Sequence, residues 1–292
     1  MKELVVQWQA GNDCNFKCEY CHHSLNSGSR PFATYERLSA GLHNLLRSTK
    51  NYDCIHIELQ GGEPTVSDSI RRLLTESLDP RLKFQLHTNA SADLSWWSQA
   101  IANCSKLILA WHYKVDTDHF KSVVDLAYNS NVPCHIVVNA DAEVDRWQQA
   151  VDAFEMFKEH AYSVSFKTLF SNYQRGNNKY LDYNYEQWTY YVESSKIVVP
   201  QDQPVEVQIQ WTEQTLYDNY LGHLCWAGVD QIVVDYAGNV YRGWCHASGS
   251  GFGNIYNNPI LLHQDATVCP KSICKNGFDK QARKSNNSWG IA

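Results

Sequence analysis

The 292-residue sequence predicts an α/β fold, a partial (β/α)6 barrel with parallel strands, followed by a small domain that contains a β-hairpin. Strand-like and helix-like segments alternate about six times over the first two-thirds of the chain, which favours a parallel sheet with right-handed crossovers. After about residue 200, glycine, asparagine and cysteine become frequent. We therefore expect one domain over residues 1–199 and a second over residues 200–292.

Six short segments have the pattern expected of strands. They are ELVVQWQ from Glu3, CIHIELQ from Cys54, KFQLHTN from Lys83, KLILAWH from Lys106, PCHIVVN from Pro133 and YSVSFKTL from Tyr162. Helical patterns lie between them, as in TYERLSAGLHNLLRS and AEVDRWQQAVDAFEMFKEH. Six units are too few for a closed eight-stranded barrel, so the predicted barrel is partial.

One face of these strands is unusually polar. Side chains alternate between faces along a strand, and one face here carries Gln7, Gln9, His56, Glu58, Gln60, Gln85, His87, Asn89, His135, Asn139, Ser163, Ser165 and Lys167. Because a packed barrel fills its lumen with branched apolar residues, this pattern predicts a wet or ligand-filled lumen. The alternative is a partly open sheet with one solvated face. The candidate substrate-contacting residues of the lumen are His56, Glu58, His87, His135 and Lys167.

The region after residue 200 predicts small, irregular elements. PVEVQIQW has the pattern of a strand and TEQTLYDNYLG that of a short helix. IVVDYAGNVYRGWC predicts a hairpin whose turn is formed by residues 236–239. Little apolar sequence remains for a core, which indicates a domain that needs a metal to stabilise it.

Composition excludes several classes of protein. The net charge of −6 and the pI of about 6.0 give no general signal for nucleic acid. The basic cluster near the C-terminus is most simply a solvated tail; it comprises Lys271, Lys275, Lys280, Arg283 and Lys284. No stretch is apolar enough for a signal peptide or a membrane span, so we expect a cytoplasmic protein. Three isolated cysteines are expected in the core, namely Cys54, Cys104 and Cys134.

Three further cysteines are crowded together directly after the first strand. Cys14, Cys18 and Cys21 stand within eight positions and are followed by His22 and His23. A zinc ion could take the three thiolates and one histidine in a closed site. An iron–sulfur cube normally takes four cysteines. Three cysteines on a cube would leave one iron open to bind a small molecule.

The triplet resembles the signature of the radical S-adenosylmethionine (radical SAM) superfamily. Cys14-x3-Cys18-x2-Cys21 has the aromatic Tyr20 before its last cysteine, and GGEP follows at residues 61–64, after the second strand. The resemblance covers about residues 2–170 and implies a [4Fe–4S] cluster with S-adenosylmethionine on its open iron. It further implies S-adenosylmethionine contacts from Tyr20, Gly61, Gly62, Glu63, Asn89 and Asn139. For Asn89 and Asn139, strand-end capping is an equal alternative.

The last four cysteines resemble a second module. Cys225 in CWAG, Cys245 at the end of GNVYRGWC, and then Cys269 and Cys274 are similar to the twitch domain, a short form of the SPASM domain. This resemblance implies a second [4Fe–4S] cluster, held by four protein thiolates. The four-residue gap between Cys269 and Cys274 is wider than the family's usual spacing. A structural zinc ion on the same thiolates is the alternative.

Together the resemblances imply an oxidoreductase that cleaves S-adenosylmethionine to a 5′-deoxyadenosyl radical, which takes a hydrogen atom from a substrate. An electron donor such as a flavodoxin or a ferredoxin is implied. A peptide undergoing ribosomal peptide maturation is the first substrate candidate, although the first strand begins at Glu3 and leaves no room for a leader-binding domain before it. A nucleotide or DNA base and a small molecule are alternatives. Two non-enzymatic interpretations also stay open, a two-cluster electron-transfer protein and a zinc-stabilised binding module.

Overall fold

The computed structural model of the chain describes residues 1–21, 23–76, 78–159, 163–172, 179–195, 220–246, 251–274 and 276–285. Some predictions fall outside these residues, namely those on His22, Lys275, the start of the sixth strand at Tyr162, the strand PVEVQIQW and most of the helix TEQTLYDNYLG.

Six parallel strands form the centre of the fold, which confirms the predicted partial barrel. They pair in chain order as β1 (Glu3–Gln9), β2 (Cys54–Gln60), β3 (Leu82–Thr88), β4 (Cys104–Trp111), β5 (Cys134–Ala140) and β6 (Ser163–Thr168). Each observed strand lies within two residues of its predicted limits. The alternating pattern located them because it records which side chains meet the helices.

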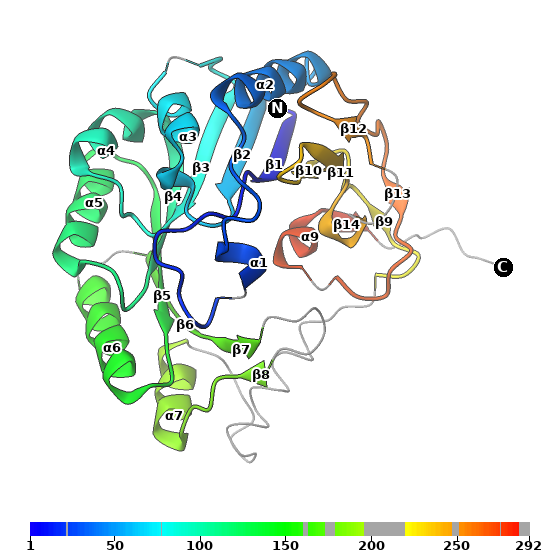
Figure 1. The fold of residues 1–292 in the computed structure, drawn as a ribbon. Coiled ribbons are helices and arrows are strands. Elements are labelled where there is room, and N and C mark those ends of the chain that lie inside the picture. The colour runs from blue at the N-terminus through cyan, green and yellow to red at the C-terminus, as the bar shows by residue number, and fades with distance from the viewer. Residues whose placement is uncertain are drawn as a thin grey trace.

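Helices cover the convex side of the curved sheet (Figure 1). They are α2 (Tyr35–Ser48), α3 (Asp68–Leu73), α4 (Leu94–Ala100), α5 (Thr117–Asn129) and α6 (Val144–Glu159), with short 3-10 turns η1 (Pro64–Val66) and η2 (Ile101–Asn103). Side chains cap several N-termini: Thr34 accepts from Arg37 N, and Asp116 accepts from Asp118 N and His119 N. Within the described residues, no helix combines the length and the apolar character that a membrane crossing requires.

The two faces of the sheet differ as predicted. On β2, Ile55, Ile57 and Leu59 are at most 1% exposed and pack under the helices, while His56 and Glu58 between them keep partial solvent contact. Strand register then aligns polar side chains across the concave face, with Gln7 beside Glu58 and Glu58 beside Gln85. The apolar face thus supplies burial energy, and the polar face stays available for chemistry.

The C-terminal region extends the same sheet. β10 (Gln231–Val234) pairs in parallel with β1 and forms an antiparallel hairpin with β11 (Asn239–Tyr241), which pairs with β12 (Gly253–Asn254). This confirms the predicted hairpin; Asp235 holds its turn by accepting from Ala237 N and Asn239 N. A division between residues 199 and 200 stays a prediction.

The remaining elements are short. β7 (Phe170–Asn172) pairs with β8 (Lys179–Tyr180), and α7 (Tyr185–Ser194) begins with a capping box of Asn184 and Gln187. α1 (His23–Asn26) follows the cysteine triplet. The small sheet β13–β9–β14 is built from Thr267–Val268, Leu224–Cys225 and Lys284–Ser285, beside η3 (Trp244–His246) and α9 (Gly277–Gln281).

All ten cysteines are free thiols. Cys104 is 5% exposed and belongs to the core, as predicted. Cys54 and Cys134 are only half-buried, and the Cys54 thiol lies 3.4 Å from His56 Nε2. Cys134 still packs against the core cluster, so its assignment to the core is partly right, whereas Cys54 is not part of that cluster.

Candidate functional site

The cysteine triplet lies in the loop that leaves the carboxyl end of β1. Asn12, which is fully buried, organises the start of this loop: its side chain donates to Ser24 O and accepts from Arg30 N at 2.7 Å. Further along, Asn26 donates to the carbonyl oxygens of Cys18 and Cys21. Backbone groups that would otherwise lack partners are thus satisfied, which fixes the path of the loop.

The three thiols lie within electrostatic range of one another. Burial is the main cause that raises the pKa of Cys14 and Cys18, and it raises the pKa of Cys21 to about 11. Glu63 adds to the rise in the pKa of Cys14 and Asp141 to that of Cys18, while Cys14 and Cys18 both add to that of Cys21. Within the described part of the chain, no group of three or more His, Cys, Asp or Glu side chains is gathered tightly enough for a single metal ion.

The GGEP segment presses against the cysteine loop. Gly61 and Gly62 have φ values of +100° and +57°, and a Cβ on Gly62 would lie 2.0 Å from the carbonyl oxygen of Asp13. Glu63 N then donates to that same oxygen at 2.8 Å. The two glycines are therefore required by the close approach of the loop backbone, whichever ligand the segment binds.

The Glu63 side chain is occupied within the protein. It is 1% exposed, and its carboxylate accepts from Thr65 N, Thr65 Oγ1, Thr88 Oγ1 and Asn89 N at 2.6–3.0 Å. It therefore ties the end of β2 to the end of β3. The predicted contact between Glu63 and S-adenosylmethionine stays a prediction.

The two predicted asparagines have different surroundings. The Asn89 amide donates to Asn15 Oδ1 at 2.9 Å, which fastens the cysteine loop to the end of β3. The Asn139 amide donates to Trp111 O at 3.1 Å and joins β5 to the end of β4. Both contacts fit the strand-end interpretation, and binding of S-adenosylmethionine by either residue stays a prediction.

Tyr20 contacts the end of β4 rather than standing free. Its hydroxyl forms a hydrogen bond with His112 Nδ1, and the two rings stack with centroids 6.0 Å apart. Two residues further on, Lys114 Nζ donates to Phe16 O at 2.9 Å. The connection between β4 and α5 therefore holds residues 16–20 of the cysteine loop.

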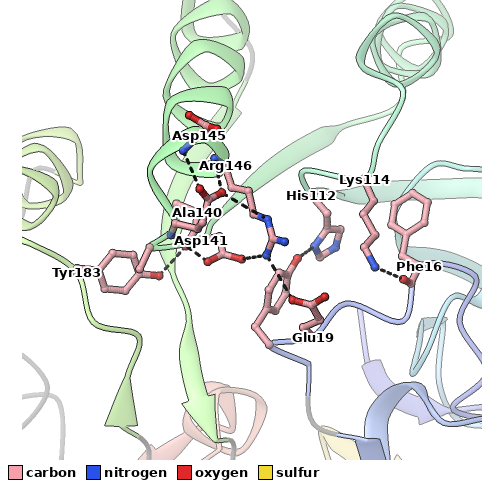
Figure 2. A network of polar contacts seen from close by, with 12 residues as sticks. Phe16, Glu19, His112, Lys114, Ala140, Asp141, Asp145, Arg146 and Tyr183 are labelled. Carbon is pink, nitrogen blue, oxygen red and sulfur yellow. Dashed lines mark hydrogen bonds and ion pairs between the residues drawn. The ribbon is translucent and has the colours of Figure 1, made fainter.

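Arg146 joins the same loop to β5 and α6. Figure 2 shows its guanidinium between Glu19 and Asp141, at 3.5 Å and 3.1 Å from their carboxylate oxygens. The guanidinium also lies over the ring of Tyr113, 4.2 Å from its centroid. Because Glu19 is 75% exposed on its side chain, its ion pair is the weakest of these contacts.

The predicted residues of the lumen do not form one cluster. His135 bonds to Ser163 and Ser165, His56 lies 3.6 Å from Glu3, and Glu58 accepts from Gln7 at 3.1 Å. These contacts lie along the concave face and involve none of the three cysteines of the loop, Cys14, Cys18 and Cys21. Lys167 alone of the five interacts electrostatically with Cys21, and no hydrogen-bond acceptor for its ammonium occurs among the described residues.

Acid should destabilise the protein through His87. Burial, and then the charge of Lys106, lowers the pKa of His87 to about 4, whereas an unfolded histidine titrates near 6.5. The unfolded chain therefore binds a proton first, so the free energy of unfolding should fall by about 3 kcal/mol between pH 6.5 and pH 4. Urea unfolding of wild type and His87→Gln at pH 7 and pH 4.5 tests this. Equal losses in both proteins would contradict it.

The last four cysteines also converge. Cys225 on β9 pairs across the sheet with Thr267 and Lys284, and Cys269 N donates to His223 O at 2.7 Å. The pKa of Cys274 is raised by burial, with smaller contributions from Cys269 and Cys225, and Cys274 in turn contributes to the raised pKa of Cys245. Cys225, Cys245 and Cys269 thus each lie within electrostatic range of Cys274.

Asp279 fixes Cys245 in this second site. It is 3% exposed, and its two oxygens accept from Trp244 N at 2.9 Å and Cys245 N at 2.8 Å. The Trp244 indole donates to Gln7 Oε1, and Gln7 donates to Glu58. A line of hydrogen bonds therefore runs from the four-cysteine site to the concave face of the barrel.

The basic residues near the C-terminus are not a loose tail where the structure describes them. Arg283 pairs with Asp230 at 3.0 Å and covers the Trp226 ring at 4.1 Å. Lys284 Nζ donates to Asp279 O and Ala282 O at the end of α9. Arg283 is solvent-exposed as expected, with 60% of its side chain accessible, whereas Lys284 is only partly exposed because its ammonium binds local carbonyl oxygens.

Sequence reasoning missed several residues of the site. Asn12, His112, Lys114, Arg146, Asp279 and Trp244 were not predicted to take part. His112 had one signal, since it is the last residue of the predicted fourth strand, and carboxyl ends of parallel strands meet at one edge. The others depend on contacts between distant parts of the chain.

No protein-family model and no curated protein matches the chain. Solved structures do match it: native anSMEcpe with bound AdoMet and Cp18Cys peptide has a TM-score of 0.54 at 17% identity, covering 88% of this chain and 78% of that one. Native anSMEcpe with bound AdoMet gives 0.54 at 16%, over 88% and 79%. SuiB of Streptococcus suis bound to precursor peptide SuiA gives 0.49 at 16%, over 88% and 63%. The chain thus has the partial-barrel fold of anSMEcpe, as its resemblance to radical SAM enzymes predicted.

Proposed function

We propose that this chain is a radical SAM enzyme that binds one [4Fe–4S] cluster on Cys14, Cys18 and Cys21. The observation that carries the proposal is the clamp between the cysteine loop and the GGEP segment, which meet at the carboxyl end of the barrel. When bound, such a cluster supplies the electron for reductive cleavage of S-adenosylmethionine, whose adenosyl group then removes a hydrogen atom from the substrate.

The residues present fit this group. Three thiols on one loop are soft ligands suited to iron and sulfide. A Cβ on Gly62 would meet the backbone beside Cys14, so the segment leaves no room for a side chain between itself and the loop. Three cysteines, rather than four, leave one iron of a cube without a protein ligand.

The chain itself would position the reactants. The half-buried polar side chains of the concave face offer hydrogen-bond donors and acceptors to a substrate, among them Gln85 and His87. The Lys167 ammonium near Cys21 adds a positive charge at the mouth of the barrel. Burial raises the pKa of Glu58, while the hydrogen bond from Gln7 opposes that rise.

We propose a second [4Fe–4S] cluster on Cys225, Cys245, Cys269 and Cys274. An unsatisfied donor supports the fit: in the partly exposed Arg242, the Nε atom is inaccessible to solvent and has no hydrogen-bond partner among the described residues. The Arg242 charge opposes the rise in the pKa of Cys245. Four thiolates around a cluster would supply the negative charge that such a guanidinium requires.

We propose a peptide as the substrate and ribosomal peptide maturation as the process. The support is the shared fold with anSMEcpe, a structure of which holds a Cp18Cys peptide with AdoMet. Electrons would come from a flavodoxin or a ferredoxin. The alternative substrates are a nucleotide, a DNA base and a small molecule. Incubation with each class, followed by product analysis, would reveal them.

Removal of the first cysteine set tests the core of the proposal. Wild-type protein reconstituted without oxygen should hold about eight iron atoms, whereas the variant with Cys14, Cys18 and Cys21 changed to alanine should hold about four. Only the wild type should form 5′-deoxyadenosine from S-adenosylmethionine after reduction. The matched control changes the other three cysteines, Cys54, Cys104 and Cys134, and should resemble wild type.

Two outcomes would contradict the proposal. Zinc in place of iron, or no iron loss in the first variant, would remove the cluster from this loop. Intact clusters that never yield 5′-deoxyadenosine would favour the alternative of a two-cluster electron-transfer protein.

A further inference from the structure

The two halves of the cysteine loop are held by different parts of the fold. The inner half, from residue 11 to residue 15, contacts the GGEP segment and the end of β3. The outer half, from residue 16 to residue 20, contacts residues 112–114 and the start of α6. Cys18 and Cys21 therefore depend on contacts that the recognisable motifs do not contain.

We propose that His112 is a positioning residue which, through Tyr20, holds Cys18 and Cys21 in the geometry needed for cluster binding. This inference rests on the proposed function for the nature of the metal centre. His112 touches neither thiol in the hydrogen-bond network; Tyr20, which stands between the two cysteines in the sequence, transmits its effect.

The hydrogen bond fixes both partners. In the neutral tautomer that carries its ring proton on Nε2, His112 Nδ1 accepts from the Tyr20 hydroxyl. His112 stays neutral because burial, and then Lys167, lowers its pKa to about 4. Stacking of the rings at an interplanar angle of 19° limits rotation of Tyr20 about its side chain.

The Tyr20 hydroxyl also reaches the first thiol of the segment. Burial raises the pKa of Cys18, and the neighbouring Tyr20 side chain opposes that rise. Asn26 meanwhile holds the carbonyl oxygen of Cys18 from the opposite side. The Cys18 backbone and side chain are thus fixed from two directions, and only the side-chain contact depends on His112.

Two flanking contacts are weaker anchors of the same half-loop. Lys114 binds Phe16 O from an exposed side chain, and Arg146 pairs with the exposed Glu19. Contacts made by exposed charged side chains contribute little to stability, because water and salt screen them. The half-buried bond between Tyr20 and His112 is therefore the contact whose loss should loosen the outer half most.

The test uses the metal-free full-length chain. His112→Phe keeps a ring against Tyr20 but removes the acceptor, whereas His112→Asn keeps an acceptor oxygen near the position of Nδ1. His43→Phe on the exposed face of α2 is the control. Iodoacetamide labelling followed by mass spectrometry compares Cys18 with Cys104, since both are 5% exposed.

We expect His112→Phe to label Cys18 about tenfold faster than wild type, with Cys104 unchanged. His112→Asn should stay within about twofold of wild type, and so should His43→Phe. Equal rates in His112→Phe and wild type would overturn the proposal. A rise of Cys104 by the same factor would do so as well, since it would indicate general unfolding.

A second measurement applies to the reconstituted protein. The electron paramagnetic resonance spectrum of the reduced cluster, recorded with and without S-adenosylmethionine, should change in His112→Phe and be restored in His112→Asn. If wild type forms no cluster while the labelling pattern holds, the proposed function fails and the role of His112 in holding the loop stands. An unchanged spectrum in His112→Phe would overturn the role itself.

Discussion

Gly62→Ala is expected to lower the free energy of unfolding by about 3 kcal/mol and to displace the cysteine loop. The φ value of +57° is costly for any residue with a Cβ, and that Cβ would lie 2.0 Å from Asp13 O. The obstacle is backbone, so no side chain can move aside. Since Glu63 N donates to the same oxygen, the displacement would break the contact that joins the two motifs.

Gly222→Ala separates the clash from the conformational strain. Gly222 has a φ value of +81° but no atom within 4 Å of its added Cβ, so this control should cost only about 1 kcal/mol. Urea unfolding of the two variants and iron content after reconstitution measure the difference. If Gly62→Ala loses no more stability or iron than Gly222→Ala, the close approach of the two motifs is not what the site depends on.

The barrel strands were predictable because their signal is local. Each strand alternates between residues under the helices and residues on the concave face, as Ile55, His56 and Ile57 do, and neighbouring letters record this alternation. The hairpin after Gln231 was predictable for a similar reason, since Gly238 supplies a turn with φ of +88° between two β-rich runs.

The pairing of that hairpin with β1 was not predictable. Parallel pairing of Val6 with Ile232 joins residues more than 200 positions apart, and no local pattern selects the partner. One indication of a central position was present. Residues Gln231–Val234 are buried throughout, as is typical of a strand covered on both faces.

In the functional site, too, local sequence features were predictable and contacts between distant residues were not. Spacing identified the two sets of cysteines, and resemblance attached a function to GGEP. Neither shows that Glu63 accepts four hydrogen bonds, because two of its three partners, Thr88 and Asn89, come from the next strand. The contacts of His112 and Arg146 with the cysteine loop likewise span about 90 and 130 residues of sequence.

Asp279→Ala should have a comparably large effect on the second site. The change leaves Trp244 N and Cys245 N without their acceptor. The carboxylate packs closely against this backbone, since an added Cβ on Gly243 would lie 2.8 Å from Asp279 Oδ1. Two unsatisfied amides cost about 3 kcal/mol together. Cys245 should then move away from the other three thiols, while β1–β6 keep their packing.

Limited proteolysis with mass spectrometry locates the effect. Asp279→Ala should be cut within residues 220–285 while the barrel stays intact, and Asp279→Asn should fall between it and wild type, because each native oxygen accepts one amide and an asparagine keeps one acceptor. Asp265→Ala, at an exposed aspartate in the same region, is the control and should behave as wild type. Cleavage of Asp279→Ala no faster than of Asp265→Ala would mean that the carboxylate does not hold Cys245, and the second site would then depend on the small sheet around Cys225 instead.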